Sequence, residues 1–326
     1  MAIIEKRTLA LALALTTIFG CQARVEPSSP DERSVNDSPA ATTQHSDDAP
    51  ASDVDNEPEP PPVDLDALAQ AVIDQPNEYE PRNAYIKELN KRGQHEKCIQ
   101  EIRSCLDLGI GPRSDLYATL SWQYAKTGQP REELKSINLA IQHAEEPDAF
   151  LYDARGDAHM KRGDFEAAFA DYSSALEIEH DSMFQRSRSI AALRSGKYEV
   201  AIKDAEQLVE LFRGNDWRES AHLSSLLACV PDDKLRDGKG ALFCAEHAAR
   251  VWQLRSPDRP LPAEIEIALA AAHAELGDFN LAIKHQEAAI KQIDGQVPDE
   301  VLEQRNLYKM KKPFRFRPPA RSNGNA

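Results

Sequence analysis

Five cysteines are the residues of this 326-residue chain best suited to covalent chemistry or metal binding. Cys98 and Cys105 lie two turns apart in one predicted helix, about 10 Å along its axis, which is beyond the reach of a disulfide. Cys229 and Cys244 flank an irregular stretch, and the sequence leaves open whether they form a disulfide or stay buried thiols. No CxxC pattern or Cys–His zinc spacing occurs, so we expect no metal site.

The histidines and carboxylates do not form a recognisable catalytic set. Nine histidines are scattered along the chain, without an HExxH pattern or a Ser/His/Asp arrangement. The stretch Asp233–Gly238 resembles the start of a calcium loop, but Leu235 and Cys244 stand where its third and twelfth positions require ligands. A glycine-rich phosphate loop is also missing from the sequence. We therefore expect no enzyme activity, no catalytic residues and no cofactor.

A recurring turn motif organises most of the chain instead. Its copies are Gly93-Gln94-His95, Gly128-Gln129-Pro130, Gly163-Asp164-Phe165, Gly196-Lys197-Tyr198 and Gly277-Asp278-Phe279. Each copy has an amphipathic helical stretch before it and another after it. A period of about 34 residues with helix–turn–helix content predicts a helical solenoid.

The unit over 149–181 is the clearest copy of this repeat. It places the small residues Gly156, Ala168 and Ala175 where two helices would approach closely, and Tyr172 on its second helix. This pattern resembles the tetratricopeptide repeat, or TPR. The resemblance implies an all-α fold, a right-handed α-solenoid of helix–turn–helix repeats with capping helices at its ends.

The sequence divides into four expected parts. They are a lipoprotein-type signal peptide over 1–21, a linker over 22–62, the TPR solenoid over 63–310 and a basic flexible tail over 311–326. Within the solenoid we expect repeats over 79–112, 114–147, 149–181, 182–215, 217–254 (divergent) and 263–296, with cap helices over 64–74 and 299–310. The basic tail can fold back on the acidic solenoid, fray or contact anionic lipid.

The first residues read as an export signal. Lys6 and Arg7 precede a short apolar run, which is too short to span a bilayer. The run ends at Cys21, in an arrangement that resembles the bacterial lipoprotein signal. The resemblance implies lipidation of Cys21 and an exported, periplasm-facing protein anchored to an envelope membrane, for which Gln22 favours the outer membrane. Because Phe19 is bulky for this pattern, cleavage by an ordinary signal peptidase is an alternative, as is an uncleaved segment.

Charge separates the linker from the folded part. Segment 22–62 has no Phe, Tyr or Trp and carries ten carboxylates against Arg24 and Arg33, which predicts a disordered acidic tether. The whole chain has a formal net charge of −15. Such a charge disfavours nucleic acid as a partner.

The TPR resemblance also implies a binding groove. In TPR solenoids the first helices of successive units line the concave face, and defined positions of each unit point inward. Carried onto this chain, these positions include Asn83, Lys87, Trp122, Phe150, Asp153, Asp157, Met160, Met183, Arg186 and Ile190. We expect Trp122 to anchor a partner and Asp153 with Asp157, one helical turn apart, to receive a basic group. The alternative is that Trp122 packs against a neighbouring helix and the carboxylates are solvated.

Taken together, these features predict a non-catalytic TPR scaffold or assembly factor, lipid-anchored at the bacterial cell envelope, that binds a protein or peptide. The expected partners are a protein of unknown identity and the membrane through the anchor. The alternative is a structural envelope protein that self-associates or contacts the cell wall.

Overall fold

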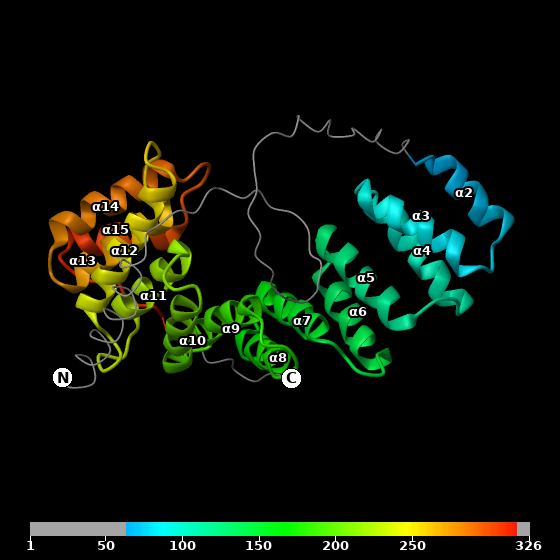
Figure 1. Ribbon diagram of the computed structural model, residues 1–326, viewed down its shortest axis with the longest axis horizontal. Coiled ribbons are helices and arrows are strands. Elements are labelled where there is room, and N and C mark those ends of the chain that lie inside the picture. Colours follow the sequence, from blue (N-terminus) through cyan, green and yellow to red (C-terminus); the bar gives the residue numbers. More distant parts are fainter. Residues whose placement is uncertain (1–62, 318–326) are drawn as a thin grey trace, which may run out of the picture.

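The computed structural model describes residues 63–317, which form fourteen α-helices and no β-strand (Figure 1). The predictions for Cys21, the signal peptide, the linker and the end of the tail lie outside the described residues. The helices are α2 (Leu65–Asp74), α3 (Tyr79–Lys91), α4 (His95–Leu108), α5 (Arg113–Lys126), α6 (Pro130–His143), α7 (Ala149–Arg162), α8 (Phe165–Ile178), α9 (Ser182–Arg194), α10 (Tyr198–Leu211), α11 (Trp217–Cys229), α12 (Gly238–Arg255), α13 (Ala263–Glu275), α14 (Phe279–Gln292) and α15 (Asp299–Lys309).

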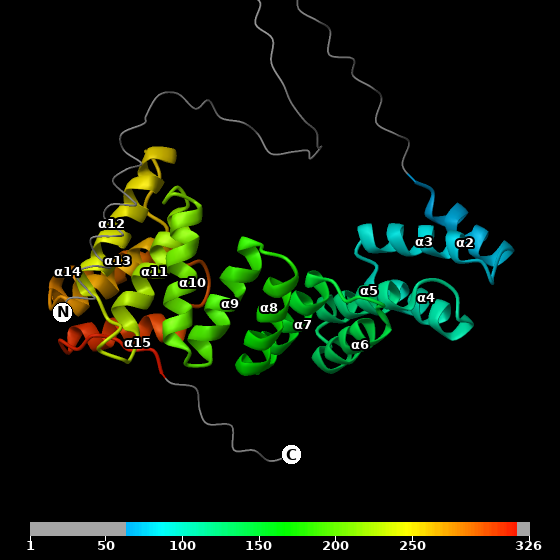
Figure 2. The ribbon, with the colours of Figure 1, turned by 60° about the horizontal axis from the view of Figure 1, so that its bottom comes forward.

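Pairs of antiparallel helices stack into a curved rod, which confirms the predicted α-solenoid. From α2 to α11, each helix contacts mainly its neighbours in sequence, so packing is distributed along the rod. Figure 1 shows α3, α5 and α7 on the inner side of the curve and α4, α6 and α8 on its outer side, and Figure 2 shows the same succession from another direction. At the C-terminal end α13 contacts both α11 and α12, and the packing there is more compact.

Glycine ends the first helix of the regular units. Gly163 caps α7 with a φ of 79°, and the turn glycines of the other copies also have positive φ. A side chain at these positions would be strained, because L residues rarely adopt this conformation, whereas glycine, which has no Cβ atom, adopts it at little cost. The recurring glycine therefore sets the sharp reversal between the two helices of a unit.

Small residues allow the two helices of a unit to approach. A Cβ atom built on Gly156 would lie 2.7 Å from the Tyr172 ring, and Ala168 is fully buried in the same unit. At the equivalent position of the unit before, the Ser121 hydroxyl donates to a backbone oxygen of α6 at 3.0 Å. Ser189 makes the corresponding bond to α10 at 2.9 Å. The close approach predicted for these positions is confirmed.

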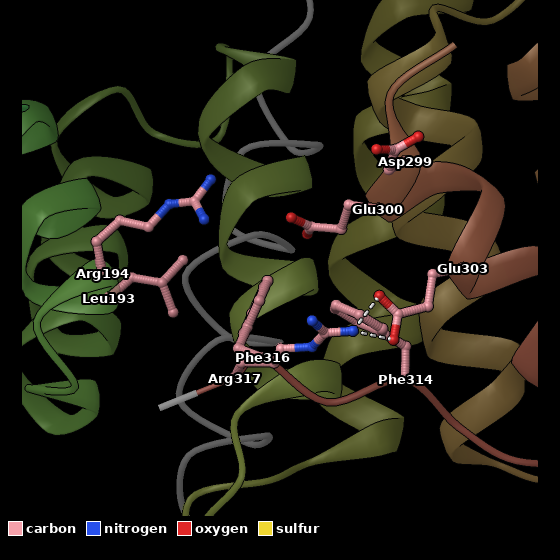
Figure 3. Close-up of a pocket in the computed structure, with 8 residues that line it drawn as sticks. All are labelled: Leu193, Arg194, Asp299, Glu300, Glu303, Phe314, Phe316 and Arg317. Atoms are coloured by element: carbon pink, nitrogen blue, oxygen red, sulfur yellow. Dashed lines mark hydrogen bonds and ion pairs between the residues drawn. The ribbon is translucent and has the colours of Figure 1, made fainter. Parts of the chain in front are cut away.

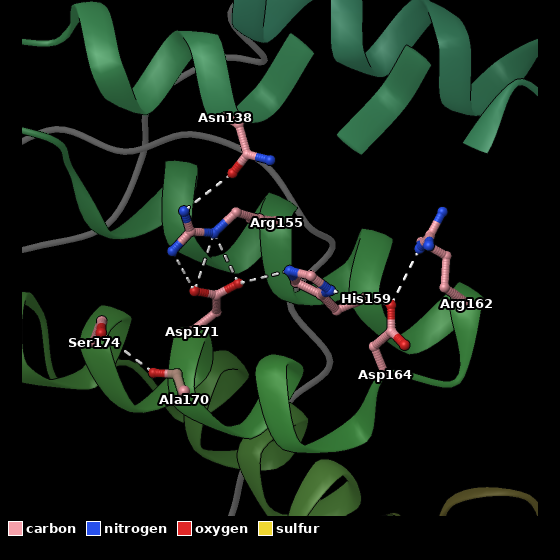
Figure 4. Close-up of polar contacts among 8 residues, drawn as sticks. All are labelled: Asn138, Arg155, His159, Arg162, Asp164, Ala170, Asp171 and Ser174. Carbon is pink, nitrogen blue, oxygen red and sulfur yellow. Dashed lines mark hydrogen bonds and ion pairs between the residues drawn. The ribbon is translucent and has the colours of Figure 1, made fainter. Parts of the chain in front are cut away.

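In each of two consecutive units, a buried ion pair at an equivalent position joins the first helix to the second. The Arg155 guanidinium on α7 donates to both carboxylate oxygens of Asp171 on α8, at 2.6 to 3.1 Å, and to Asn138 on α6 (Figure 4). Arg188 on α9 and Asp204 on α10 repeat this pair one unit later, at 2.7 and 2.8 Å. Because both aspartates are buried and neutralised, their carboxylates serve the packing of the rod.

The beginning of the tail is docked, which corrects the expectation of a flexible segment over all of 311–326. Phe314 is buried in the same core as α11 and α13. The Arg315 guanidinium donates to Glu275 at 2.5 Å. Burial of an aromatic ring and pairing with an acidic helix therefore hold this part of the tail against the solenoid, in agreement with the expectation that the tail can fold back on it.

The cysteines of the described residues are inert in this fold. Cys98, Cys105, Cys229 and Cys244 are all free and buried. Burial raises the pKa of both Cys229 and Cys244 to about 12, so their thiols stay protonated at neutral pH. In the structure, Cys229 and Cys244 are therefore two buried thiols and do not form a disulfide. Between residues 63 and 317, none of the helices has the length and apolar content that crossing a membrane requires.

Candidate docking groove

An open groove of about 990 Å³ lies between α5 and α7. Its apolar lining includes Trp122 from α5 and Phe150 from α7, both predicted groove residues. The groove also has an acidic rim, which we define as Asp115, Glu145, Glu146 and Asp148. It therefore combines exposed aromatic surface with carboxylates on the inner side of the rod.

Four large apolar side chains are exposed on three successive first helices. They are Trp122 on α5, Phe150 on α7, and Met183 and Ile190 on α9, with exposed fractions of 44%, 56%, 42% and 37%. We call this set the apolar stripe. All four are predicted groove residues. Large exposed apolar side chains on the same helix of successive units are typical of interaction sites, so this stripe is the strongest candidate for one.

Helical periodicity explains why Trp122 faces outward from the core. Leu116, Leu120 and Tyr124 recur at four-residue spacing and form the buried face of α5. Trp122 lies two residues from Leu120 and Tyr124, on the opposite side of the helix. The fold therefore exposes the indole as a consequence of the packing of α5.

The indole of Trp122 is held in place by two neighbours. Its ring meets that of His95 edge-on, with centroids 5.8 Å apart, and Lys126 Nζ lies 5.0 Å from its centroid. Trp122 therefore packs in part on a neighbouring helix, through His95 of α4, as the alternative interpretation expected. Nearly half of its side chain nevertheless stays exposed. Such a preordered aromatic side chain loses little conformational freedom when a partner binds.

Phe150 connects the groove to the next unit. Its ring packs edge-on against Phe184 of α9, with centroids 5.5 Å apart. Phe184 is fully buried, so the exposed ring of Phe150 rests on the core. The Asp148 carboxylate accepts a hydrogen bond from the Leu151 backbone at 2.9 Å and caps α7 just before Phe150.

Two carboxyls on α7 extend the acidic character along the inner face. Asp153 is half-buried, and burial, reinforced by Asp157 and Asp181, raises its pKa to about 6. Its Oδ1 atom accepts no hydrogen bond from the part of the chain that the structure describes. Asp157 accepts a hydrogen bond from the Tyr172 hydroxyl at 2.7 Å. Neither carboxyl of this predicted pair forms an ion pair with any residue between 63 and 317.

Comparison with known proteins identifies the architecture. Neither a protein-family model nor a curated protein matches the chain. Among solved structures, YrrB, described as a TPR protein with an unusual peptide-binding site, is 15% identical and superposes with a TM-score of 0.51 over 65% of this chain and 100% of its own. The chain has the TPR fold.

Other TPR structures resemble the chain over similar lengths. PilF of Pseudomonas aeruginosa is 16% identical, with a TM-score of 0.49 over 71% of this chain and 97% of its own. MamA of Desulfovibrio magneticus RS-1 is 18% identical, with a TM-score of 0.46 over 56% of this chain and 96% of its own.

The structure places four of the residues predicted from the TPR resemblance outside the groove. Asn83 is half-buried and Lys87 is exposed, both on α3, and neither lines the groove. Met160 packs into the cluster of Ala168, Tyr172 and Ala191, and Arg186 pairs with Glu219, whose carboxylate is buried. Met160 and Arg186 thus stabilise the rod, because Met160 packs against α8 and α9 and Arg186 pairs with α11 of the next unit.

The predicted groove residues included no member of the acidic rim. Asp115 occupies the same unit position as Phe150, so the TPR rule that selects Phe150 also selects Asp115. Glu145 and Glu146 lie in the loop between α6 and α7, where the repeat pattern contains no information about inward positions. Their place beside Trp122 follows only from the three-dimensional stacking of the two units.

A second cleft, of about 280 Å³, separates α9 from α15 and the docked tail (Figure 3). Leu193, Phe314 and Phe316 give it apolar walls, and the Arg317 guanidinium donates to both oxygens of Glu303 at 2.6 and 2.7 Å. Because the tail forms one wall, this cleft is the seam at which the tail docks. Residues 63–317 contain no group of three His, Cys, Asp or Glu side chains arranged to hold a metal ion.

Proposed function

We propose that the protein is a non-catalytic scaffold that binds an extended segment or a helix of another protein along the inner face of its TPR solenoid. The observation that carries this proposal is the apolar stripe, whose four side chains are exposed on successive first helices. YrrB, which is similar in fold, is described as having a peptide-binding site. That description supports a comparable use of the inner face here.

The groove favours binding because it is already formed. Trp122 is fixed between His95 and Lys126, and Phe150 rests on Phe184. A partner that buries these rings gains apolar contact area without ordering them first. This mode of recognition, in which a groove takes an extended segment or a helix, needs no chemistry from the protein.

Site-specific crosslinking in the native cell tests this proposal. A photoreactive amino acid at Phe150 should form an adduct with one or a few proteins, which mass spectrometry identifies. The same amino acid at Glu177, an exposed residue of the outer helix α8, provides the matched control. Equal adducts from both positions, or none from Phe150, would contradict binding at the inner face.

We further propose that a lipid on Cys21 holds the scaffold at a bacterial envelope membrane, as an assembly factor whose acidic linker lifts the solenoid from the surface. The basic start, the short apolar run and Cys21 itself support this proposal. Several acyl chains on one cysteine would anchor the protein stably, whereas one chain would not. Mass spectrometry of the N-terminal peptide should show acylated Cys21, and Cys21→Ser should release the protein from membranes. An unmodified Cys21 in the mature protein would refute the anchor.

A further inference from the structure

The carboxylates of the groove differ from the buried carboxylates of the solenoid in having no cationic partner. The four members of the acidic rim are exposed, and none of them forms an ion pair with any residue between 63 and 317. Four buried carboxylates between helices, by contrast, are paired with an arginine or a lysine, namely Glu133, Asp171, Asp204 and Glu219. A fifth, Glu266, pairs with His285 at 2.6 Å. These buried carboxylates between helices are thus neutralised by basic side chains, whereas the carboxylates of the acidic rim are not.

The rest of the groove adds to this imbalance. Arg113 is the only lysine or arginine among the residues that line it. Asp153 and Asp157 stand further along α7, and neither is ion-paired within the described part of the chain. Beside the groove Lys126 already lies over the Trp122 ring, an arrangement in which the ring face attracts a cation. The lining of the groove therefore combines four carboxylates with the aromatic rings of Trp122 and Phe150.

We propose that the groove recognises a segment of a partner protein in which a lysine or arginine lies next to a large apolar side chain. This inference rests on the proposed function and names the chemistry of its partner. The apolar side chain would bury against Trp122 and Phe150, and the cation would pair with the acidic rim. Complementary charge of this kind also speeds encounter and discriminates against acidic partners.

The same charges disfavour occupants from the protein itself. The linker over 22–62 carries ten carboxylates against two arginines, so the groove repels it. In the basic tail, Phe314 is buried and Arg315 is paired with Glu275 at the other end of the rod. A second copy of the chain brings a formal charge of −15. A separate, basic partner fits the groove better than any of these.

Peptide selection with charge-matched variants tests the inference. Dodecapeptides are selected from a random display library on the full chain, purified in detergent, and their affinities are measured by fluorescence anisotropy. The groove variant Asp115→Asn/Glu145→Gln/Glu146→Gln removes three carboxylates of the rim. The control variant Glu96→Gln/Glu177→Gln/Glu199→Gln makes the same charge change at exposed positions of outer helices. A third variant, Trp122→Ala, tests independently of charge whether a peptide binds in the groove.

We expect selected peptides to contain Lys or Arg beside Phe, Trp or Leu. The groove variant should weaken their binding about tenfold, and the control variant should weaken it less than about twofold. If binding depends on Trp122 but both triple variants behave alike, or the peptides are acidic or uncharged, the inference is wrong and the proposed function stands. If no selected peptide depends on Trp122, the proposed function fails, and this inference fails with it.

Discussion

Gly156 of α7 and the ring of Tyr172 on α8 lie so close that a Cβ atom on the glycine would come within 2.7 Å of the ring. The Tyr172 ring is itself nearly fully buried, and its hydroxyl donates to Asp157 on the inner face at 2.7 Å. The Tyr172 ring therefore sets the spacing of the two helices, and its hydroxyl positions a carboxylate on the inner face of α7.

Gly156→Ala should destabilise the solenoid by about 2 kcal/mol, because the added methyl group overpacks a core that has no room for it. Urea unfolding followed by circular dichroism measures the change. Ser174→Ala, at the outer surface of α8, is the control and should change stability by less than about 0.5 kcal/mol. A Gly156→Ala protein as stable as the wild type would show that the two helices can separate at little cost.

The ion pair between Arg155 and Asp171 should matter far more than a surface pair in the same unit. Arg155→Gln removes the arginine that pairs with the buried Asp171 carboxylate and leaves it only the His159 ring, whose Nε2 atom lies 3.9 Å away. This loss should cost about 3 kcal/mol of unfolding free energy. Arg162 and Asp164, which Figure 4 shows nearby, form an exposed pair. Arg162→Gln should therefore cost less than about 1 kcal/mol. Equal losses from the two substitutions in urea unfolding would contradict this assignment.

Asp153 should make the protein less stable at neutral pH than at mildly acidic pH. Its folded-state pKa, about 6, lies above the ordinary value of 3.8, so its ionised form is disfavoured in the folded state. The penalty is fully present above about pH 6 and is relieved as the pH falls towards 4. Asp153→Asn should therefore stabilise the protein by about 1 kcal/mol at pH 8, allowing for its partial exposure, and by almost nothing at about pH 4.

Thermal or urea unfolding of the wild type and Asp153→Asn at the two pH values measures this difference. Glu177→Gln is the control, because Glu177 is exposed. A gain from Asp153→Asn that is the same at both pH values would rule out titration of Asp153 as its cause.

The docked tail should stabilise the C-terminal end of the rod. The Phe316 backbone donates to the Cys229 carbonyl at the end of α11 at 2.9 Å, and Phe314 fills the core beside it. Phe314→Ala should cost about 3 kcal/mol and increase amide hydrogen exchange in α11. Arg317→Ala, at a side chain that is 77% exposed, should leave exchange there unchanged. Wild-type protection of α11 in Phe314→Ala would mean that the tail docks without stabilising this helix.

The sequence predicts much of the fold because its signals are local. The turn glycine of each regular unit has the positive φ that glycine allows. In the clearest unit, Gly156 and Ala168 lie where the two helices pack closely, as their small size allows. The apolar stripe could also be predicted, because the inward-facing positions of a first helix occur at fixed places in each repeat unit. Trp122 and Phe150 could thus be predicted by carrying the inward positions of the TPR family onto this chain.

Features that depend on long-range stacking could not be predicted in this way. Glu145 and Glu146 join the groove only because the loop that carries them passes between two stacked units. Met160 and Arg186 have the inward register but are engaged by neighbouring helices, which their spacing does not reveal. The docking of Phe314 against α11 joins segments far apart in the sequence, and no local pattern encodes it.

The most direct test of the central claim is the affinity of a selected dodecapeptide for Trp122→Ala, measured by fluorescence anisotropy on the full chain. Loss of this anchor should weaken binding about thirtyfold, or about 2 kcal/mol, with the far-ultraviolet circular dichroism unchanged. Leu211→Ala is the control, because Leu211 is 61% exposed on the outer helix α10, and it should bind as the wild type does. Equal affinities of Trp122→Ala and the wild type would contradict partner binding through the inner groove.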